Sequence, residues 1–267
     1  MATVTPDQAQ QLFALCNSHL CCPASPSPPC IPFLYPDDGC WARAHEMCRL
    51  MIAAGAQPAK IWIYGGLHVQ SANKPDCNVN WYWHVAPTLQ VSTATGIETW
   101  VVDPSLFTQA VSQATWVSVQ GNPNPTLAPS SADIYTLSPP TYSTTTDLTY
   151  TQTNIDLQTY RNLLQLRSVG PAGPPPYIAC LARPPGVQWL GSLAPNQTQA
   201  WYTWGWPAAW HVVWTVMPLT ECPGGPQLTW RTEAERPDAN NSTYWITVTN
   251  LTSDPVNFEG RYDVLSQ

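Results

Sequence analysis

The chain has 267 residues and a mass of 29.4 kDa, which is enough for one large domain or two ordinary ones, and two are expected. Charged residues make up only 10% of the chain, and with 17 acidic against 10 basic side chains the formal net charge is −7. This composition excludes highly charged disordered proteins and coiled coils, and it leaves no basic surface for nucleic acid or anionic lipid. The sequence has neither an apolar stretch long enough to predict a membrane span nor, at its start, the basic and apolar regions of a signal peptide.

Two helices are predicted near the start of the chain. Residues 7–20 follow a proline and place apolar side chains on one face, which indicates a short amphipathic helix. A second helix is predicted over 39–54, where apolar residues recur at helical spacing. Asp37 and Asp38 offer side-chain oxygens to cap its start, and Gly55 is suited to end it.

Runs rich in aromatic and β-branched residues then predict strands of one sheet at 60–69, 81–91 and 98–103. A short helix is expected around 105–114, and a strand at the sequence IYTL. A further helix is predicted over 155–167. Together these elements indicate a first domain in which helices accompany one sheet.

The pattern changes after this domain, which is predicted to span 1–168. The proline-rich segment 169–186 is interpreted as a linker, and the strand-like runs of 187–267 indicate a small antiparallel β-sandwich. This module is rich in tryptophan, which suits either an aromatic platform for sugar or lipid or an ordinary core. We favour the core, because alternation along the chain puts Trp210 and Trp214 on one face.

Nine cysteines are spread irregularly along the chain, at positions 16, 21, 22, 30, 40, 48, 77, 180 and 222. They include no CxxC pair and no histidine at zinc-ligand spacing, so no structural metal site is expected. Two interpretations remain open: a reduced protein with buried thiols, or an oxidised one with up to four disulfides and one free thiol. We favour the second, and hence a secreted protein, because four cysteines lie within 16–30, around a proline-rich loop that needs crosslinks. Cytoplasmic or effector delivery remains an alternative.

The chemistry is expected at Cys40. A cysteine in the first turn of a helix faces unpaired backbone N–H groups and the positive end of the helix dipole, which both favour the thiolate. The following strands supply a general base, His84, and an orienting carboxylate, Asp103. If these strands are adjacent and antiparallel, the three side chains can meet at the helix start. Each residue also has an ordinary alternative: a core thiol, a core histidine and a turn-capping aspartate.

Neighbouring residues are assigned supporting roles. His45 lies well round the helix from Cys40 and is interpreted as a structural residue. Arg43 and Glu46 are expected to be solvated or structurally paired. Four aromatic residues either wall a slot for the substrate or belong to the core: Trp41, Trp81, Tyr82 and Trp83.

The segment IPFLYPDDGCWARAHEM, residues 31–47, closely resembles the active-site segment of the bacterial protein-glutamine glutaminases. These are protein deamidases with a transglutaminase-like, papain-related core, and the resemblance implies an α+β fold for this chain. The resemblance extends over residues 31–168 and includes the strand YGGLHV, the histidine segment WHV and the segment VVDPSLF. It implies that Cys40 is the nucleophile, that His84 is the base and that Asp103 orients the base. It covers neither the cysteine-rich start of the chain nor the C-terminal module.

The resemblance implies hydrolysis of protein-bound glutamine to glutamate and ammonia through a cysteine thioester, with no cofactor and no metal. The expected partners are proteins or peptides with accessible glutamine, with neither nucleic acid nor membrane as a partner, and the chain is expected to be a monomer. Two alternatives remain open. One is a transglutaminase-type acyl transferase, and the other is a binding or effector protein with a vestigial catalytic half.

Overall fold

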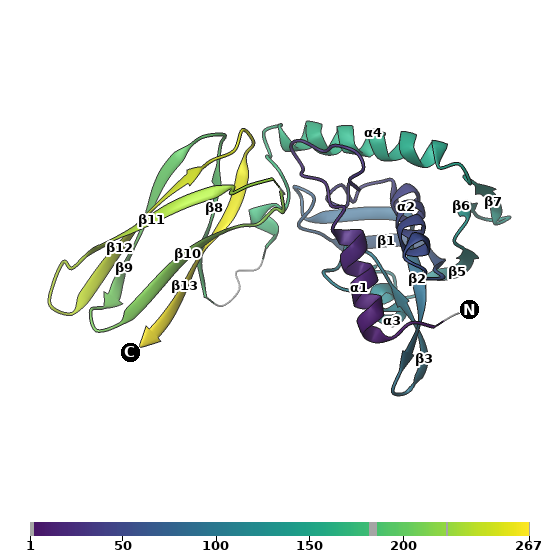
Figure 1. Ribbon diagram of the computed structural model, residues 1–267, viewed down its shortest axis with the longest axis horizontal. Helices are drawn as coiled ribbons and strands as arrows, with labels where there is room; N and C mark the ends of the chain where they lie inside the picture. Colours follow the sequence, from purple (N-terminus) through teal and green to yellow (C-terminus); the bar gives the residue numbers. More distant parts are fainter. Residues whose placement is uncertain (1–2, 182–185, 223, 267) are drawn as a thin grey trace. The chain divides into compact units, whose positions relative to one another are not determined.

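The computed structural model describes residues 3–181, 186–222 and 224–266 (Figure 1). The chain divides into two compact units, of which the first comprises Met1–Cys21 and Pro26–Leu164 and the second Cys22–Ser25 and Gln165–Gln267. The first unit mixes helices with an antiparallel sheet, and the second is built mainly from strands. The α+β architecture predicted from the sequence is therefore confirmed.

The first unit begins with two helices, α1 (Pro6–Asn17) and α2 (Cys40–Ala53). Helix α1 starts with a capping box, in which Thr5 Oγ1 accepts from the Gln8 backbone and Gln8 Oε1 accepts from the Thr5 backbone. Both helices bury an apolar face in one core, which they share with β2, as the amphipathic spacing predicts. The predicted end of the second helix is also present, since Gly55 follows its last turn with a φ of 86°.

A five-stranded antiparallel sheet has the order β4-β3-β2-β1-β5. Its strands are β1 (Ala59–Gln70), β2 (Asn78–Thr93), β3 (Gly96–Val101), β4 (Val111–Ser112) and β5 (Thr126–Ser131). The three strands predicted for one sheet are thus confirmed, and the central pair β2 and β3 is antiparallel, with Thr88 opposite Val101. Helix α2 packs on β2, so the helix start lies next to the strand that carries His84.

The helix predicted over 105–114 is wrong. After Asp103 the chain makes a tight turn, in which the Asp103 carbonyl accepts from the backbone N–H groups of Leu106 and Phe107. Helix α3 (Gln113–Ser118) forms only after β4, where Ser112 Oγ accepts from the Thr115 backbone. Because of this turn and this cap, the helix forms later in the chain than the predicted range 105–114.

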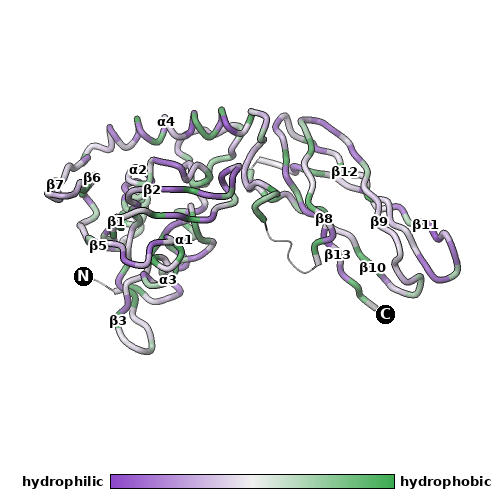
Figure 2. Tube along the Cα trace, turned by 180° about the vertical axis from the view of Figure 1, so that it is seen from behind, coloured by the Kyte–Doolittle hydropathy of each residue, from purple (hydrophilic) through white to green (hydrophobic). Residues whose placement is uncertain are grey.

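The first unit ends with a hairpin and a long helix. The hairpin is formed by β6 (Ile134–Ser138), which contains the predicted IYTL strand, and β7 (Ser143–Thr146). Helix α4 (Thr151–Ser168) starts earlier than predicted. Hydrophilic and hydrophobic residues alternate along it (Figure 2), and Leu157 and Leu164 are fully buried.

The second unit is the predicted β-sandwich. Its strands are β8 (Val187–Leu193), β9 (Thr198–Pro207), β10 (His211–Pro218), β11 (Leu228–Glu235), β12 (Asn241–Asn250) and β13 (Val256–Ser266). They form two three-stranded antiparallel sheets, with the orders β10-β13-β8 and β11-β12-β9. Both sheets contribute to one core, which includes Val212, Trp214, Ile246 and Phe258.

The proline-rich segment interpreted as a linker belongs to this second unit where it is described. Thr220 Oγ1 donates to the Pro175 carbonyl at 2.6 Å, and the Asn257 side chain donates to the carbonyls of Pro174 and Pro176. A short 3₁₀ turn, η1 (Ile178–Cys180), follows. Residues 182–185 of the predicted linker lie outside the described residues.

Disulfides join Cys21 to Cys30 and Cys22 to Cys222, and Cys77 and Cys180 are disulfide-bonded as well. The three remaining cysteines are free and buried: Cys16, Cys40 and Cys48. The expectation of a single free thiol is therefore wrong. Its physical reason is that Cys16 on α1 and Cys48 on α2 point into the packed interior, where each behaves as a small apolar side chain.

Candidate active site

Cys40 is the first residue of α2 and is 6% exposed. The preceding residue, Gly39, is the N-cap in a left-handed conformation with a φ of 80°, and no side chain caps the helix. The predicted capping by Asp37 or Asp38 is therefore wrong, because Asp38 Oδ1 accepts from the Gly39 backbone at 2.9 Å instead. As a result, no side-chain oxygen caps the first turn of the helix, to which Cys40 belongs.

His84, on β2, is 1% exposed. Its Nε2 lies 2.8 Å from Oδ2 of Asp103, which follows the end of β3. Its other ring nitrogen, Nδ1, is buried and has no regular hydrogen bond among the described residues. The imidazole also interacts with the Cys40 side chain. Because Asp103 occupies Nε2, Nδ1 is the ring nitrogen available for this interaction.

Asp103 is 2% exposed and makes three side-chain hydrogen bonds. Besides His84, the Trp116 indole donates to Oδ2 at 2.9 Å and the Ser105 backbone donates to Oδ1 at 3.2 Å. Burial opposes its ionisation, but the charge and hydrogen bond of His84, the Trp116 donor and the charge of Arg43 together lower the pKa of Asp103 below its ordinary value. The carboxylate is therefore held in its charged form.

The same contacts stabilise the charged form of His84. Burial alone would lower its pKa, but the charge and hydrogen bond of Asp103, followed by the interaction with Cys40, raise the pKa of His84 from 6.5 to about 9. The ring is also held between two indoles. Trp81 stacks on it at a centroid distance of 4.5 Å, and Trp116 stacks at 5.6 Å. These contacts fix the plane of the imidazole between Cys40 and Asp103.

Two buried side chains fix the loop before α2. Arg43 Nη1 donates to the carbonyls of Tyr35 and Asp38 at 2.9 and 2.6 Å. The Trp81 indole donates to the carbonyls of Pro36 and Asp37, both at 3.1 Å. Trp81 thus contacts both the histidine and the loop that leads to the cysteine, and so sets their relative positions.

Arg43 is 2% exposed, so the expected solvated role is wrong for this residue and the structurally paired role is correct. Burial lowers the pKa of Arg43, while the nearby Cys40, Asp103 and Asp38 oppose this effect. Glu46 is also buried and is paired with Arg49. The guanidinium of Arg43 thus supplies positive charge close to both the nucleophile and the orienting carboxylate.

His45 has the structural role predicted for it. Its Nε2 lies 3.2 Å from the Asp147 carbonyl and its Nδ1 lies 2.9 Å from Nζ of Lys60. Lys60 is 1% exposed, and burial lowers its pKa to about 8. This buried pair makes no contact with His84 and belongs to the support of α2.

The predicted aromatic residues divide between several roles. Trp83 packs with Trp41 and Trp62, at centroid distances of 5.6 and 5.5 Å, in the cluster that also contains Cys40. Tyr82 is 87% exposed and takes no part in that cluster. Trp41 and Trp83 therefore line the side of Cys40, whereas Trp81 supports the histidine.

The sequence reasoning missed Trp116 as a contact of the site. Its indole reaches Asp103 from α3, an element that the sequence pattern placed too early. The only signal available was its place in the run QATWVS, which shows nothing of a distant carboxylate.

Within the described ranges, no group of three or more histidine, cysteine or acidic side chains is arranged to hold a metal ion. No helix in the part of the chain that the structure describes is long and apolar enough to cross a membrane.

Comparison with known proteins identifies the first unit. A family described as glutaminase matches residues 9–120. A crystal structure of protein-glutaminase is 30% identical, covering 61% of this chain and 91% of its own, with a TM-score of 0.53. The NMR structure of protein-glutaminase from Chryseobacterium proteolyticum is 30% identical and covers 64% and 94% of the two chains, with a TM-score of 0.55. A search of curated proteins finds no match.

A crystal structure of pro-protein-glutaminase is also similar, at 29% identity and a TM-score of 0.54, and the match covers 68% of this chain and 66% of that one. The family match over residues 9–120 includes α2 and strands β1 to β4, and the solved protein-glutaminases have a papain-like fold. Because the chain covers nine-tenths of a solved protein-glutaminase at 30% identity, it belongs to the protein-glutaminase family.

Proposed function

We propose that this chain hydrolyses the side-chain amide of protein-bound glutamine, with Cys40 as the nucleophile, His84 as the acid and base, and Asp103 as the orienting carboxylate. The observation that supports this most is the arrangement around His84. Its Nε2 contacts Asp103 and its Nδ1 is left for Cys40, which lies at the uncapped start of α2. Membership of the protein-glutaminase family supports the same reaction.

In the first half of the reaction, the Cys40 thiolate attacks the amide carbon and forms a carbon–sulfur bond. The carbonyl oxygen becomes an oxyanion next to the start of α2, where backbone N–H groups and the helix dipole favour negative charge. The protonated His84 then gives its proton to the leaving nitrogen. The carbon–nitrogen bond breaks, and ammonia leaves a γ-glutamyl thioester on Cys40.

In the second half, neutral His84 takes a proton from a water molecule that attacks the thioester carbon. The carbon–sulfur bond breaks, and the thiolate–imidazolium pair is restored. The product leaves as the side-chain carboxylic acid of glutamate, which then loses its proton to solvent. Asp103 keeps the ring oriented through Nε2 and stabilises its positive charge, and Trp81 and Trp116 keep it in plane. No step needs a cofactor.

The side of the site next to Trp41 and Trp83 is apolar. Trp41 and Trp83 lie in the cluster around Cys40 and are only partly buried, so we assign them to the methylenes of the glutamine side chain. The partner is then a protein or peptide with an accessible glutamine. The disulfide bonds suit an oxidising compartment, and a secreted, monomeric enzyme is proposed.

Transfer to an amine is not favoured, because the matched structures are protein-glutaminases. The test is ammonia release from a soluble glutamine-rich protein, followed by mass spectrometry of its peptides in the presence of excess primary amine. We expect conversion of glutamine to glutamate, little amine incorporation and much slower ammonia release from free glutamine. Dominant amine incorporation would show a transferase instead.

Cys40→Ala tests the assignment of the nucleophile. We expect this variant to fold and to lose ammonia release by several orders of magnitude, as the loss of a covalent nucleophile does elsewhere. Cys48→Ala is the matched control, since Cys48 is a free cysteine on the same helix that does not contact His84. Equal activity of the Cys40→Ala variant and wild type would refute the mechanism.

A further inference from the structure

Three aromatic side chains lie together on the solvent side of the sheet β11-β12-β9. Tyr202 and Trp204 come from β9, and Trp245 comes from β12, where it is the register partner of Tyr202. The rings of Tyr202 and Trp245 are stacked with centroids 5.1 Å apart, and Trp204 continues the series at 5.6 Å from Tyr202. Their exposed fractions are 59% for Tyr202, 71% for Trp204 and 40% for Trp245. These three residues are called the aromatic face below.

The sandwich does not need the aromatic face for its core. The next residue of β12, Ile246, points to the other side of the sheet and is fully buried. The expectation that tryptophans of this module serve as core is correct for Trp214, but wrong for Trp204 and Trp245. A contiguous exposed apolar patch on a folded protein indicates an interaction site, because apolar side chains that stay in water do not add to the stability of the fold.

The rings are also prepared for binding. Each is held against a neighbouring ring across or along the strands, so that few rotamers are lost when a ligand arrives. Tryptophan and tyrosine offer large contact areas with only two rotatable bonds each. A rigid ligand surface with a flat apolar side is therefore the best match.

The charges beside the aromatic face decide the class of ligand. Strand β11 places Glu233 opposite Trp245, and Glu235 accepts from the Trp245 indole at 3.3 Å. The cation of this strand, Arg231, lies 3.9 Å from Glu233 and is paired with it. The two lysines of the chain are elsewhere, at Lys60 and Lys74. Nucleic acid or anionic lipid thus finds no complementary charge here.

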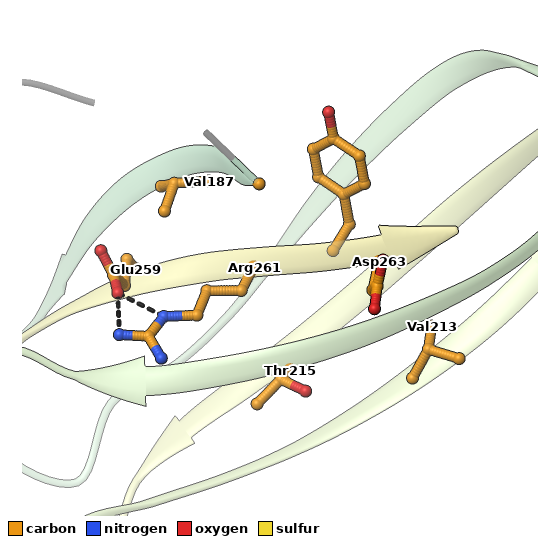
Figure 3. Close-up of a pocket in the computed structure, with 8 residues that line it drawn as sticks. Val187, Val213, Thr215, Glu259, Arg261 and Asp263 are labelled. Atoms are coloured by element: carbon orange, nitrogen blue, oxygen red, sulfur yellow. Dashed lines mark hydrogen bonds and ion pairs between the residues drawn. The ribbon is translucent and has the colours of Figure 1, made fainter. Parts of the chain in front are cut away.

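The outer side of the other sheet offers no equivalent. Figure 3 shows the hollow there, into which Val187, Val213 and Thr215 project and where Glu259 and Arg261 pair with each other. Glu259 and Arg261 neutralise each other there, and no stack of exposed rings borders the hollow in the described part of this unit.

We propose that the aromatic face binds a neutral glycan chain. One side of a pyranose ring carries apolar C–H groups, which pack on the flat side of an indole or phenol ring. The hydroxyl groups at the rim of the sugar are hydrogen-bond donors, and the carboxylates of Glu233 and Glu235 are acceptors next to the rings. The C-terminal module would then hold the enzyme on a polysaccharide surface, independently of its deamidase activity.

The test is a sedimentation assay of the full-length protein with insoluble chitin and with microcrystalline cellulose. We expect wild type to bind at least one of them, Trp204→Ala and Tyr202→Ala to weaken binding by about tenfold or more, and Trp204→Phe to retain most of it. Trp230→Ala is the matched control. Trp230 lies in the same sheet with the same 40% exposure as Trp245, but its register partner is the core residue Val248. Its variant should bind like wild type.

Circular dichroism and ammonia release from a soluble protein should be unchanged in all these variants, which shows that each has folded. Three results would overturn the proposal. The first is that wild type binds neither polysaccharide, and the second is that the aromatic variants bind as well as wild type. A dimer in sedimentation velocity that Trp204→Ala dissociates would assign the face to a second copy of the chain instead.

Discussion

The pKa of His84 is raised by two side chains, the Asp103 carboxylate at Nε2 and Cys40. Asp103 contributes more than Cys40 to the raised pKa of His84. We therefore expect Asp103→Asn to lower the pKa of His84 strongly and Cys40→Ala to lower it less. Titration of the histidine ring signals by NMR measures both shifts. A larger shift in Cys40→Ala would contradict the order of these two contacts.

The raised pKa of His84 also predicts how stability depends on pH. The folded state binds this proton more tightly than the unfolded state, so the contribution is fully present below pH 6.5 and is lost as the pH rises through about 9. Its size is on the order of 2 to 4 kcal/mol. Lys60, whose lowered pKa is about 8, acts in the opposite direction.

The comparison of wild type with His84→Gln separates the two effects, since both proteins keep Lys60. We expect denaturant unfolding to show that the stability advantage of wild type over His84→Gln falls between pH 6.5 and 10. A constant difference over this range would show that His84 is not protonated in the folded state at neutral pH.

In the proposed mechanism, Trp116 acts on the reaction through its hydrogen bond to Asp103. Trp116→Phe removes the donor at 2.9 Å while it keeps an aromatic ring in the buried site. The pKa of Asp103 should rise, so the acidic limb of the pH–activity profile should move to higher pH, and kcat should fall by about tenfold. A merely structural role would lower stability without moving that limb. The measurement is the pH profile of ammonia release, with unfolding followed in parallel.

At the scale of elements, the start of α2 is fixed by a glycine. A Cβ at Gly39 would lie 2.3 Å from Cδ2 of Tyr160, and the φ of 80° is itself unfavourable for other residues. We expect Gly39→Ala to lower the free energy of unfolding by about 2 to 4 kcal/mol and to reduce activity, because the helix start must shift. Thermal and denaturant unfolding check the first effect.

Gly55→Ala provides the matched control at the other end of the same helix. Gly55 has a φ of 86°, but a Cβ there would meet nothing within 4 Å. This variant should lose about 1 kcal/mol from backbone strain alone and should keep full activity. Equal effects of the two substitutions would show that the contact with Tyr160 does not matter.

The elements differ in how far the sequence could predict them. Helix α2 and strands β1 to β3 have strong local patterns, and the spacing of Cys40, His84 and Asp103 on them was sufficient to suggest that they meet. The cap of α2 could not be predicted, because the choice between Asp38 and Gly39 depends on the space left by Tyr160, 121 residues away by numbering (160 − 39). The contact of Trp116 with Asp103 could not be predicted for a similar reason, because only the tertiary fold brings the indole to this carboxylate.

At the scale of the whole molecule, the state of the nine cysteines connects the fold with the chemistry. An odd number of cysteines allows one free thiol or three. Sequence spacing cannot distinguish these two cases, because it is burial that keeps Cys16 and Cys48 reduced. Burial also raises the pKa of Cys16 and of Cys48 to about 12, so that both are poor nucleophiles at neutral pH. Cys40 instead faces the imidazolium of His84.

We therefore expect iodoacetamide to modify Cys40 first in the native protein and to abolish ammonia release in proportion. After denaturation without reduction, three cysteines should be modified, namely Cys16, Cys40 and Cys48, and after reduction all nine should react. Peptide mapping by mass spectrometry distinguishes these states. Modification of Cys21, Cys22, Cys30 or Cys222 before reduction would contradict the disulfides, whereas rapid native modification of Cys48 would contradict the packing of α2. Inactivation that follows the labelling of Cys40 alone would show that the reactive thiol is the one at the start of α2, where no side chain caps the backbone.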